Sequence, residues 1–166
     1  MTRMHHLRCE LWLPLPRSSV FPFFANPDNL ALITPPQMRF KMRGHRSRQM
    51  RPGLLIDHTI YWLGLPLQWQ SRIARYDPPH FFVDQQAQGP YRYWSHTHTF
   101  NEDNGGTLIG DHVEYQLPLG PLGEVAQAIM VRRQLEGIFS YRQKRVREIL
   151  LGADAPKAIE RPTTFT

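Results

Sequence analysis

The sequence predicts an α+β fold in which a curved antiparallel sheet of about seven strands wraps around one long C-terminal helix, with two short helices after the first strand. Three observations lead to this prediction. Short alternating segments run from residue 38 to 117, apolar residues then recur at helical spacing from about 122 to 150, and Gly- and Pro-rich turns separate the segments. Because strands repeat every two residues and helices every 3.6, the two patterns divide the chain.

The chain opens with a strand and two short helices. Residues 6–13 alternate weakly and predict the strand, which is ended by prolines. We place the first helix at 18–25 with Ser19 as its N-cap, because this puts Pro22 in the first turn, where its missing N–H leaves little unpaired. Asn26 then caps the second helix and a proline follows it.

Six further strands are expected before the last helix, at 38–43, 54–63, 67–76, 80–88, 91–100 and 107–117. Successive side chains of a strand point to opposite faces. Alternation therefore groups Ile56, His58, Ile60 and Trp62, then Trp69, Ser71 and Ile73, and finally Ile109, Asp111, Val113, Tyr115 and Leu117. The facing of 80–88 stays open. The Asn/Asp/Gly-rich stretch 101–106 is typical of a hairpin loop.

The last helix spans about 122–150, roughly 40 Å at 1.5 Å per residue, and is long enough to cross the sheet. Arg142 falls on its apolar stripe. Either this arginine extends its charge to the helix edge, or it points inward and pairs with Asp111 or an anionic group of a ligand. Residues 1–151 thus predict one domain. Residues 152–166 are polar and contain proline, so we expect a disordered tail.

The bulk composition fits a cytoplasmic globular protein. Cys9 is the only cysteine, which leaves no internal disulfide. No stretch approaches the roughly 18 apolar residues of a membrane span, and the N-terminus lacks the apolar run of a secretory signal. The net charge is +6, with arginines crowded at 39–51. No nucleic-acid-binding motif accompanies this basic segment, so we expect solvated surface and no nucleic-acid partner.

The most informative segment for function is 89–100. Read with period two, one face carries Trp94, His96, His98 and Phe100, and the other carries Tyr93, Ser95, Thr97 and Thr99. The hydroxyl face suits water, so two histidines point inward between aromatic rings. Buried polar groups need partners. The pattern therefore predicts a polar-lined pocket, a metal site or a hydrogen-bonded core network.

A ligand site would draw on all the inward aromatic and polar residues. The candidate ligand-binding residues are His58, Trp62, Trp69, Trp94, His96, His98, Phe100, Asp111, Tyr115, Phe139 and Arg142. Apolar walls with a few convergent polar groups are typical of such sites. Acid–base catalysis is a more specific hypothesis for the same residues, with His96, His98, Asp111 and Tyr115 as the candidate catalytic residues. A network that only holds strands in register is the alternative.

His96 and His98 also raise the option of a metal. At positions i and i+2 of one strand they sit about 7 Å apart, and Asp111 could complete a three-ligand set. Gly89, the two histidines and Glu102 resemble the first metal motif of cupin barrels. However, Glu102 lies in the hairpin loop, no second motif follows, and cupins do not end in a helix this long. We therefore expect neither a metal nor another cofactor.

Several short motifs occur in a characteristic order: Pro27-Asp-Asn-Leu30 with Thr34-Pro-Pro36, Gly89-Pro-Tyr91, Trp94-Ser-His-Thr-His98, Asp111-His-Val-Glu-Tyr115 and Phe139-Ser-Tyr-Arg142. With the order of elements, they resemble the START-like, helix-grip superfamily (SRPBCC), and most of all bacterial ligand-binding domains of the polyketide cyclase/dehydrase and lipid-transport type. The resemblance covers roughly residues 5–150. It implies a cavity for a hydrophobic ligand between sheet and C-terminal helix, but no particular ligand.

These observations predict a protein that binds or transports a hydrophobic or aromatic small molecule, lipid- or polyketide-like, in a cavity beneath the last helix. A polyketide cyclase/dehydratase-type enzyme using the same cavity is the first alternative. An anion-, nucleic-acid- or phospholipid-binding module built on the basic outer strand is the second. Apolar residues on edge strands and loops would also suit a homodimer.

Overall fold

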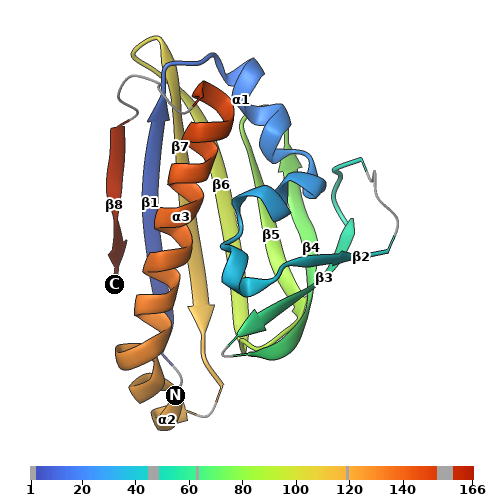
Figure 1. Cartoon of the computed structure of the whole chain (residues 1–166), viewed down its shortest axis with the longest axis vertical. Helices are drawn as coiled ribbons and strands as arrows, with labels where there is room; N and C mark the ends of the chain where they lie inside the picture. Colours follow the sequence, from blue (N-terminus) through green and yellow to red (C-terminus); the bar gives the residue numbers. More distant parts are fainter. Residues whose placement is uncertain (1–2, 45–48, 63, 119, 153–158) are drawn as a thin grey trace.

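The structure is a computed structural model that describes residues 3–44, 49–62, 64–118, 120–152 and 159–166. These residues form an eight-stranded antiparallel sheet that curves around one long helix (Figure 1). Its strands are β1 (His5–Leu13), β2 (Lys41–Arg43), β3 (Leu55–Trp62), β4 (Leu65–Asp77), β5 (Phe81–Gln88), β6 (Tyr93–Asp103), β7 (Gly106–Gln116) and β8 (Ile159–Phe165). Their order across the sheet is β2-β3-β4-β5-β6-β7-β1-β8.

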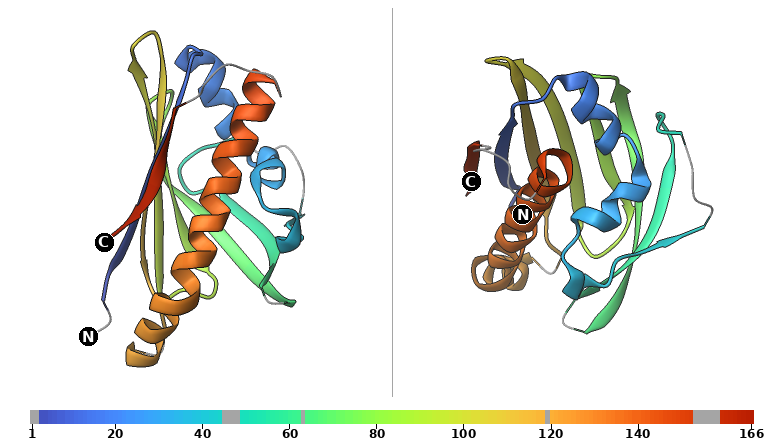
Figure 2. Two further views of the ribbon diagram at one scale, coloured as in Figure 1. Left: turned by 60° about the vertical axis from the view of Figure 1, so that its left-hand side comes forward. Right: turned by 45° about the horizontal axis from the view of Figure 1, so that its top comes forward.

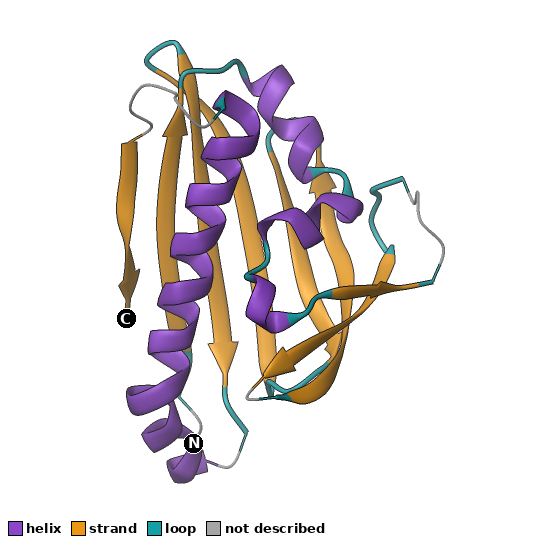
Figure 3. Cartoon of the chain, viewed as in Figure 1, coloured by secondary structure: helices purple, strands orange, loops and turns teal. Residues whose placement is uncertain are grey.

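The helices of the described residues lie on one face of the sheet (Figures 2 and 3). The first group consists of α1 (Arg17–Phe24), the 3₁₀ helix η1 (Pro27–Ile33) and the short η2 (Pro36–Met38). The second consists of α2 (Gly120–Ala126), the π-helical turn η3 (Gln127–Val131) and the long α3 (Arg132–Leu151). This is the predicted arrangement: an α+β fold in which a curved sheet holds a long C-terminal helix.

Local signals explain where most elements begin and end. Asn26 caps η1 as predicted, because its side chain accepts a hydrogen bond from the Asp28 backbone N–H at 3.1 Å. Asn104 and Gly105 have positive φ angles of 46° and 76°, as a two-residue hairpin turn requires, and they join β6 to β7. The helix expected at 18–25 is confirmed as α1, but its predicted N-cap was wrong, and Pro22 lies inside the helix and not in its first turn. The carbonyl of Pro16 starts the first turn, so Ser19 is not the N-cap.

The C-terminal tail also differs from expectation. Residues 153–158 lie outside the described residues, but β8 pairs with β1, with Leu7 opposite Phe165. The described residues therefore form eight strands where about seven were predicted. The polar composition of the tail led to the wrong prediction, because a strand that adds to an existing sheet needs little apolar surface of its own. The edge of β1 offers backbone hydrogen bonds, and Phe165 packs against the core.

The core consists of two apolar clusters separated by polar side chains. The first cluster includes Leu11, Leu13, Val20, Phe21, Phe24, Phe82, Phe100, Ile109 and Val146. The second includes Leu7, Cys9, Trp94, Val113, Tyr115, Leu117, Val131, Leu135 and Phe139. On β6 the clusters meet at His96 and His98, on β7 at Asp111, and on α3 at Arg142 and Gln143.

Candidate functional site

A cavity of about 390 Å³ lies between the concave face of the sheet, η1 and α3. One wall carries Ile56, His58, Ile60 and Trp62 from β3, with Leu67, Trp69, Ser71 and Ile73 from β4. These are the inward faces that alternation predicts, so the sequence assigns the facing of both strands correctly. On the opposite side α3 contributes Leu135, Ile138 and Phe139. The cavity is therefore largely apolar and aromatic.

The structure brings most of the predicted site residues to this cavity. Those that line it are His58, Trp62, Trp69, Trp94, His96, His98, Phe139 and Arg142. Phe100 and Tyr115 do not reach it, because both are fully buried in the apolar clusters. Asp111 lies behind the two histidines and does not line the cavity either. Of the four candidate catalytic residues, only His96 and His98 can touch a bound molecule.

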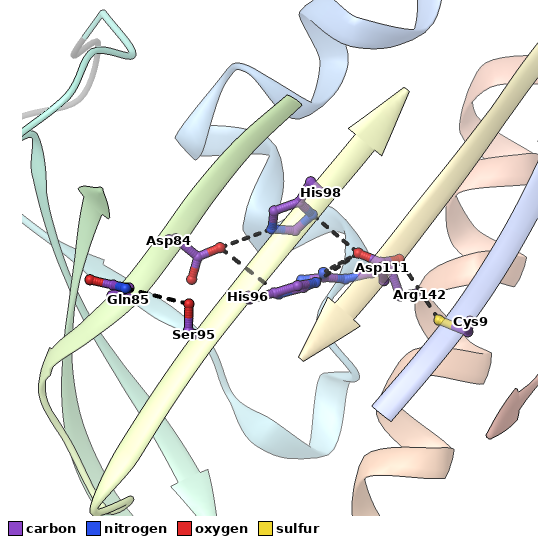
Figure 4. Close-up of polar contacts among 8 residues, drawn as sticks. All are labelled: Cys9, Asp84, Gln85, Ser95, His96, His98, Asp111 and Arg142. Atoms are coloured by element: carbon purple, nitrogen blue, oxygen red, sulfur yellow. Dashed lines mark hydrogen bonds and ion pairs between the residues drawn. The ribbon is translucent and has the colours of Figure 1, made fainter. Parts of the chain in front are cut away.

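A layer of polar side chains, which we call the polar layer, lies at one wall of the cavity (Figure 4). Asp84, His96, His98 and Arg142 line the cavity, and Asp111 lies behind them. His96 Nε2 lies 2.8 Å from Asp111 Oδ1, and His98 Nε2 lies 2.8 Å from Asp84 Oδ2. The side chains of both histidines are only 5% and 6% exposed. Each imidazole thus has a carboxylate partner in a buried setting.

The pKa values of His96 and His98 are shifted in opposite directions. Burial, helped by the charge of His98, lowers the pKa of His96 to about 4. Burial alone would also lower the pKa of His98, but its close contacts with the carboxylates of Asp111 and Asp84 outweigh burial and raise that pKa. Burial would raise the pKa of Asp111, but its contacts with His96 and His98 outweigh burial and hold that pKa well below its usual value. The layer therefore favours two carboxylates, a cationic His98 and a neutral His96.

Arg142 points inward, the second of the two alternatives that the sequence leaves open. Its side chain is 12% exposed, and Nη1 lies 3.9 Å from Asp111 Oδ1. Its guanidinium carbon also lies 5.4 Å from the ring centre of Phe139. Nε and Nη1 have no hydrogen-bond partner among the described residues. Buried cations need pairing, so Arg142 supplies positive charge that Asp111 compensates only in part.

Asp84 is the polar residue that sequence reasoning missed. It lies opposite His96 in the β5–β6 pairing and lines the cavity. Its signal in the sequence is a single acid next to Phe81, Phe82 and Val83. Alternation could not orient it, because Phe82 and Val83 are both buried and the neighbouring β4–β5 pairing contains register shifts. Only the paired strand reveals which face Asp84 occupies.

A third histidine, His58, lines the cavity without a carboxylate bound to it. It stacks between Phe40 and Trp69, with ring centres 5.0 and 6.0 Å away. Burial lowers its pKa to about 4, partly offset by the negative charge of Asp84. Its Nδ1 atom has no hydrogen-bond partner in the described part of the chain. His58 is therefore a neutral ring in an aromatic wall at physiological pH.

A second histidine–carboxylate group lies on the outer face of the sheet. This outer group consists of His6, His112 and Glu114, with His6 Nδ1 3.2 Å from His112 Nε2 and 3.8 Å from Glu114 Oε1. Its members are only partly buried. It shares residue types with the polar layer but does not line the cavity beneath α3, and its partly buried side chains form a surface cluster.

The other features noted in the sequence give less evidence for a function. Cys9 is buried, and burial together with the charge of Asp111 raises its thiol pKa. A nucleophilic role is thereby disfavoured, because only the thiolate reacts. In the basic segment, Lys41 and Arg43 are exposed on β2, while residues 45–48 lie outside the described residues. No helix among the described residues is long and apolar enough to cross a membrane.

Comparison with known proteins shows the fold. No family model and no curated protein matches the chain. Solved structures do match, among them protein CV1439 from Chromobacterium violaceum (15% identity, 90% of this chain and 98% of that chain, TM-score 0.67). Norcoclaurine synthase from Thalictrum flavum (14%, 90% and 88%, 0.66) and major latex-like protein 151 from Panax ginseng (10%, 89% and 98%, 0.63) match similarly. The chain therefore has the START-like helix-grip fold.

Proposed function

We propose that the protein binds or transports a hydrophobic or aromatic small molecule in the cavity beneath α3. The observation that carries the proposal is the cavity itself: about 390 Å³ of space lined by indole, phenyl and aliphatic side chains, with one polar wall. Small-molecule sites usually combine apolar walls with a few convergent polar groups that orient the ligand. A lipid- or polyketide-like compound with one oxygen-bearing end would place that end against the polar layer.

The test is binding of a neutral apolar dye, Nile red, followed by its emission. We expect saturable binding with a blue shift. Ser71 is buried on the cavity wall, so Ser71→Phe fills part of the cavity and should lower dye affinity at least tenfold. The matched control is Gln68→Phe, on the exposed side of the same strand, which should leave affinity unchanged. No dye binding, or equal binding by both variants, would contradict the proposal.

A second candidate is acid–base catalysis on the bound molecule, of the cyclase/dehydratase kind. It is favoured by the His96–Asp111 contact at the cavity wall, because a carboxylate can hold an imidazole in one tautomer. In this case His96→Gln should abolish turnover of a polyketone while affinity for it stays within about threefold. Loss of affinity without any measurable turnover by the wild-type protein would instead favour binding alone.

A further inference from the structure

We propose that the polar layer binds a divalent transition-metal ion through Asp84 Oδ2, His96 Nδ1 and His98 Nε2. These three donor atoms all lie within 4.8 Å of one another. Asp84 Oδ2 is 2.8 Å from His98 Nε2 and 3.8 Å from His96 Nδ1. Ligand atoms that share one ion at about 2.0–2.2 Å lie roughly 3 Å apart, so only small side-chain shifts are needed.

The backbone explains why these donors converge. Asp84 and His96 are direct partners in the antiparallel β5–β6 pairing. His98 follows His96 by two residues and therefore lies on the same face of β6. The two rings pack with centres 3.7 Å apart, and Phe82 stacks on His98 at 4.2 Å. The site thus stands on rigid strands and not on a loop.

Asp111 supplies the outer support that metal-binding histidines need. Such histidines usually donate their second ring N–H to a carboxylate, which fixes the tautomer and turns the free nitrogen toward the metal. Asp111 Oδ1 lies 2.8 Å from His96 Nε2 and 3.1 Å from His98 Nδ1. If both rings turn these nitrogens to Asp111, the remaining nitrogens face Asp84. Asp111 is therefore a positioning residue in this site and not a ligand.

A divalent cation is compatible with the charge of this layer. Asp84 and Asp111 put two carboxylates in one buried cluster, with side chains 19% and 7% exposed. Without a metal, a protonated His98 and Arg142, which lies 3.9 Å from Asp111, balance these two negative charges. A divalent ion would displace the proton from His98 and leave one net positive charge in the layer. That surplus suits an anionic oxygen of a bound molecule.

The structure also explains why the sequence argued against a metal. Glu102, the ligand expected from the cupin-like pattern, is 70% exposed and pairs with Arg17. The third ligand is instead Asp84, from a strand whose facing the sequence leaves open. Imidazole and carboxylate together suit zinc, iron, cobalt or nickel ions.

Three protein ligands leave coordination positions open. Since Asp84, His96 and His98 all line the cavity, those positions face the space where a ligand would lie. This last step rests on the proposed function: the ligand would be an apolar molecule with a carboxylate, phenolate or enolate oxygen, which would complete the coordination. The ion site itself does not depend on that step.

The experiment is a titration of the chelator-stripped full chain with Co²⁺ alone, followed by visible ligand-field absorption. The outer group is a competing site, because its donor atoms also lie within 4.8 Å of one another. His112→Ala removes it and serves as the matched control. We expect one equivalent of tightly bound Co²⁺ in the wild type and in His112→Ala. Asp84→Asn should weaken binding by more than about 100-fold and Asp111→Asn by about 10- to 100-fold.

The inference is overturned if the wild type binds no Co²⁺, or if binding is lost in His112→Ala and kept in Asp84→Asn. Should Asp84→Asn fail to fold, X-ray absorption of cobalt-loaded His112→Ala decides. Two imidazoles in the cobalt shell support the site, and fewer overturn it. Nile red binding by the metal-free protein tests the cavity separately. Dye binding without Co²⁺ binding would contradict the metal site alone. Co²⁺ binding without dye binding would contradict the proposed function alone.

Discussion

Two histidine–carboxylate groups lie on opposite faces of the same sheet, and they differ in almost everything except residue type. In the outer group the side chains of His6 and Glu114 are 31% and 37% exposed, and its two imidazole rings lie 5.4 Å apart. In the polar layer the rings are 3.7 Å apart and nearly inaccessible to solvent. The inner histidines also contact two carboxylates, Asp84 and Asp111.

The difference teaches that the face of the strand, more than the residue, decides what a histidine can do. Asp111 and His112 are neighbours in the chain, yet one belongs to the buried layer and the other to the outer group. Burial strengthens every charge interaction inside the sheet, because the local dielectric is low and water cannot screen it. On the outer face the same pairs contribute little.

The largest expected effect concerns stability. Asp111→Ala would leave Arg142 without its carboxylate partner and His98 with Asp84 alone. Removing one partner of a buried ionic group costs about 3–5 kcal/mol. The free energy of unfolding, measured in urea, should fall by about that amount. Glu114→Ala, the matched change in the outer group, should alter it by less than about 0.5 kcal/mol. Equal losses in both variants would show that the buried layer is not special.

Much of the fold could be predicted because it follows from local signals. Period-two alternation placed the inward faces of β3 and β4, and the helical period located the long C-terminal helix. Asn26 was recognised as a cap because capping depends on a few adjacent residues. Each of these patterns depends only on residues within one helix or strand, so a single sequence suffices to interpret it.

What could not be predicted depends on pairings between distant segments. Asp84 joins the polar layer only because β5 pairs with β6 in one particular register. The strand β8 exists because β1 offers it an edge, which the composition of the tail does not show. Tyr115 and Phe100 were correctly placed on inward faces. Whether an inward residue reaches the cavity, however, depends on what packs over it.

The second prediction uses His58, an inner histidine that lacks a carboxylate partner. Its pKa in the folded protein is about 4, against 6.5 ordinarily. As the pH falls, His58 therefore binds a proton near pH 6.5 in the unfolded chain but only near pH 4 in the folded chain. Stability from the neutral ring is fully present above pH 6.5 and is lost as the pH falls toward 4, by an amount on the order of 3 kcal/mol.

His58→Phe keeps an aromatic ring between Phe40 and Trp69 and removes the titrating group. Urea unfolding from pH 7 to pH 4 should then show a shallower loss of stability than in the wild type. Phe40→Leu is the matched control. It weakens the same stack without changing a titrating group, so it should lower stability about equally at every pH. An unchanged slope in His58→Phe would show that His58 does not resist protonation.

The smallest expected effect separates the inward arginine of α3 from an outward one. Arg142 lines the cavity and has donors without hydrogen-bond partners among the described residues, whereas the Arg145 side chain is 34% exposed and pairs with Glu148. A long-chain fatty acid and the corresponding alcohol differ only in the charged end. Arg142→Met should weaken binding of the acid about tenfold, or about 1.4 kcal/mol, and leave the alcohol nearly unchanged. Calorimetric titration with both ligands checks this, with Arg145→Met as the control. If Arg142→Met weakens both ligands equally, the side chain contributes packing and no charge recognition.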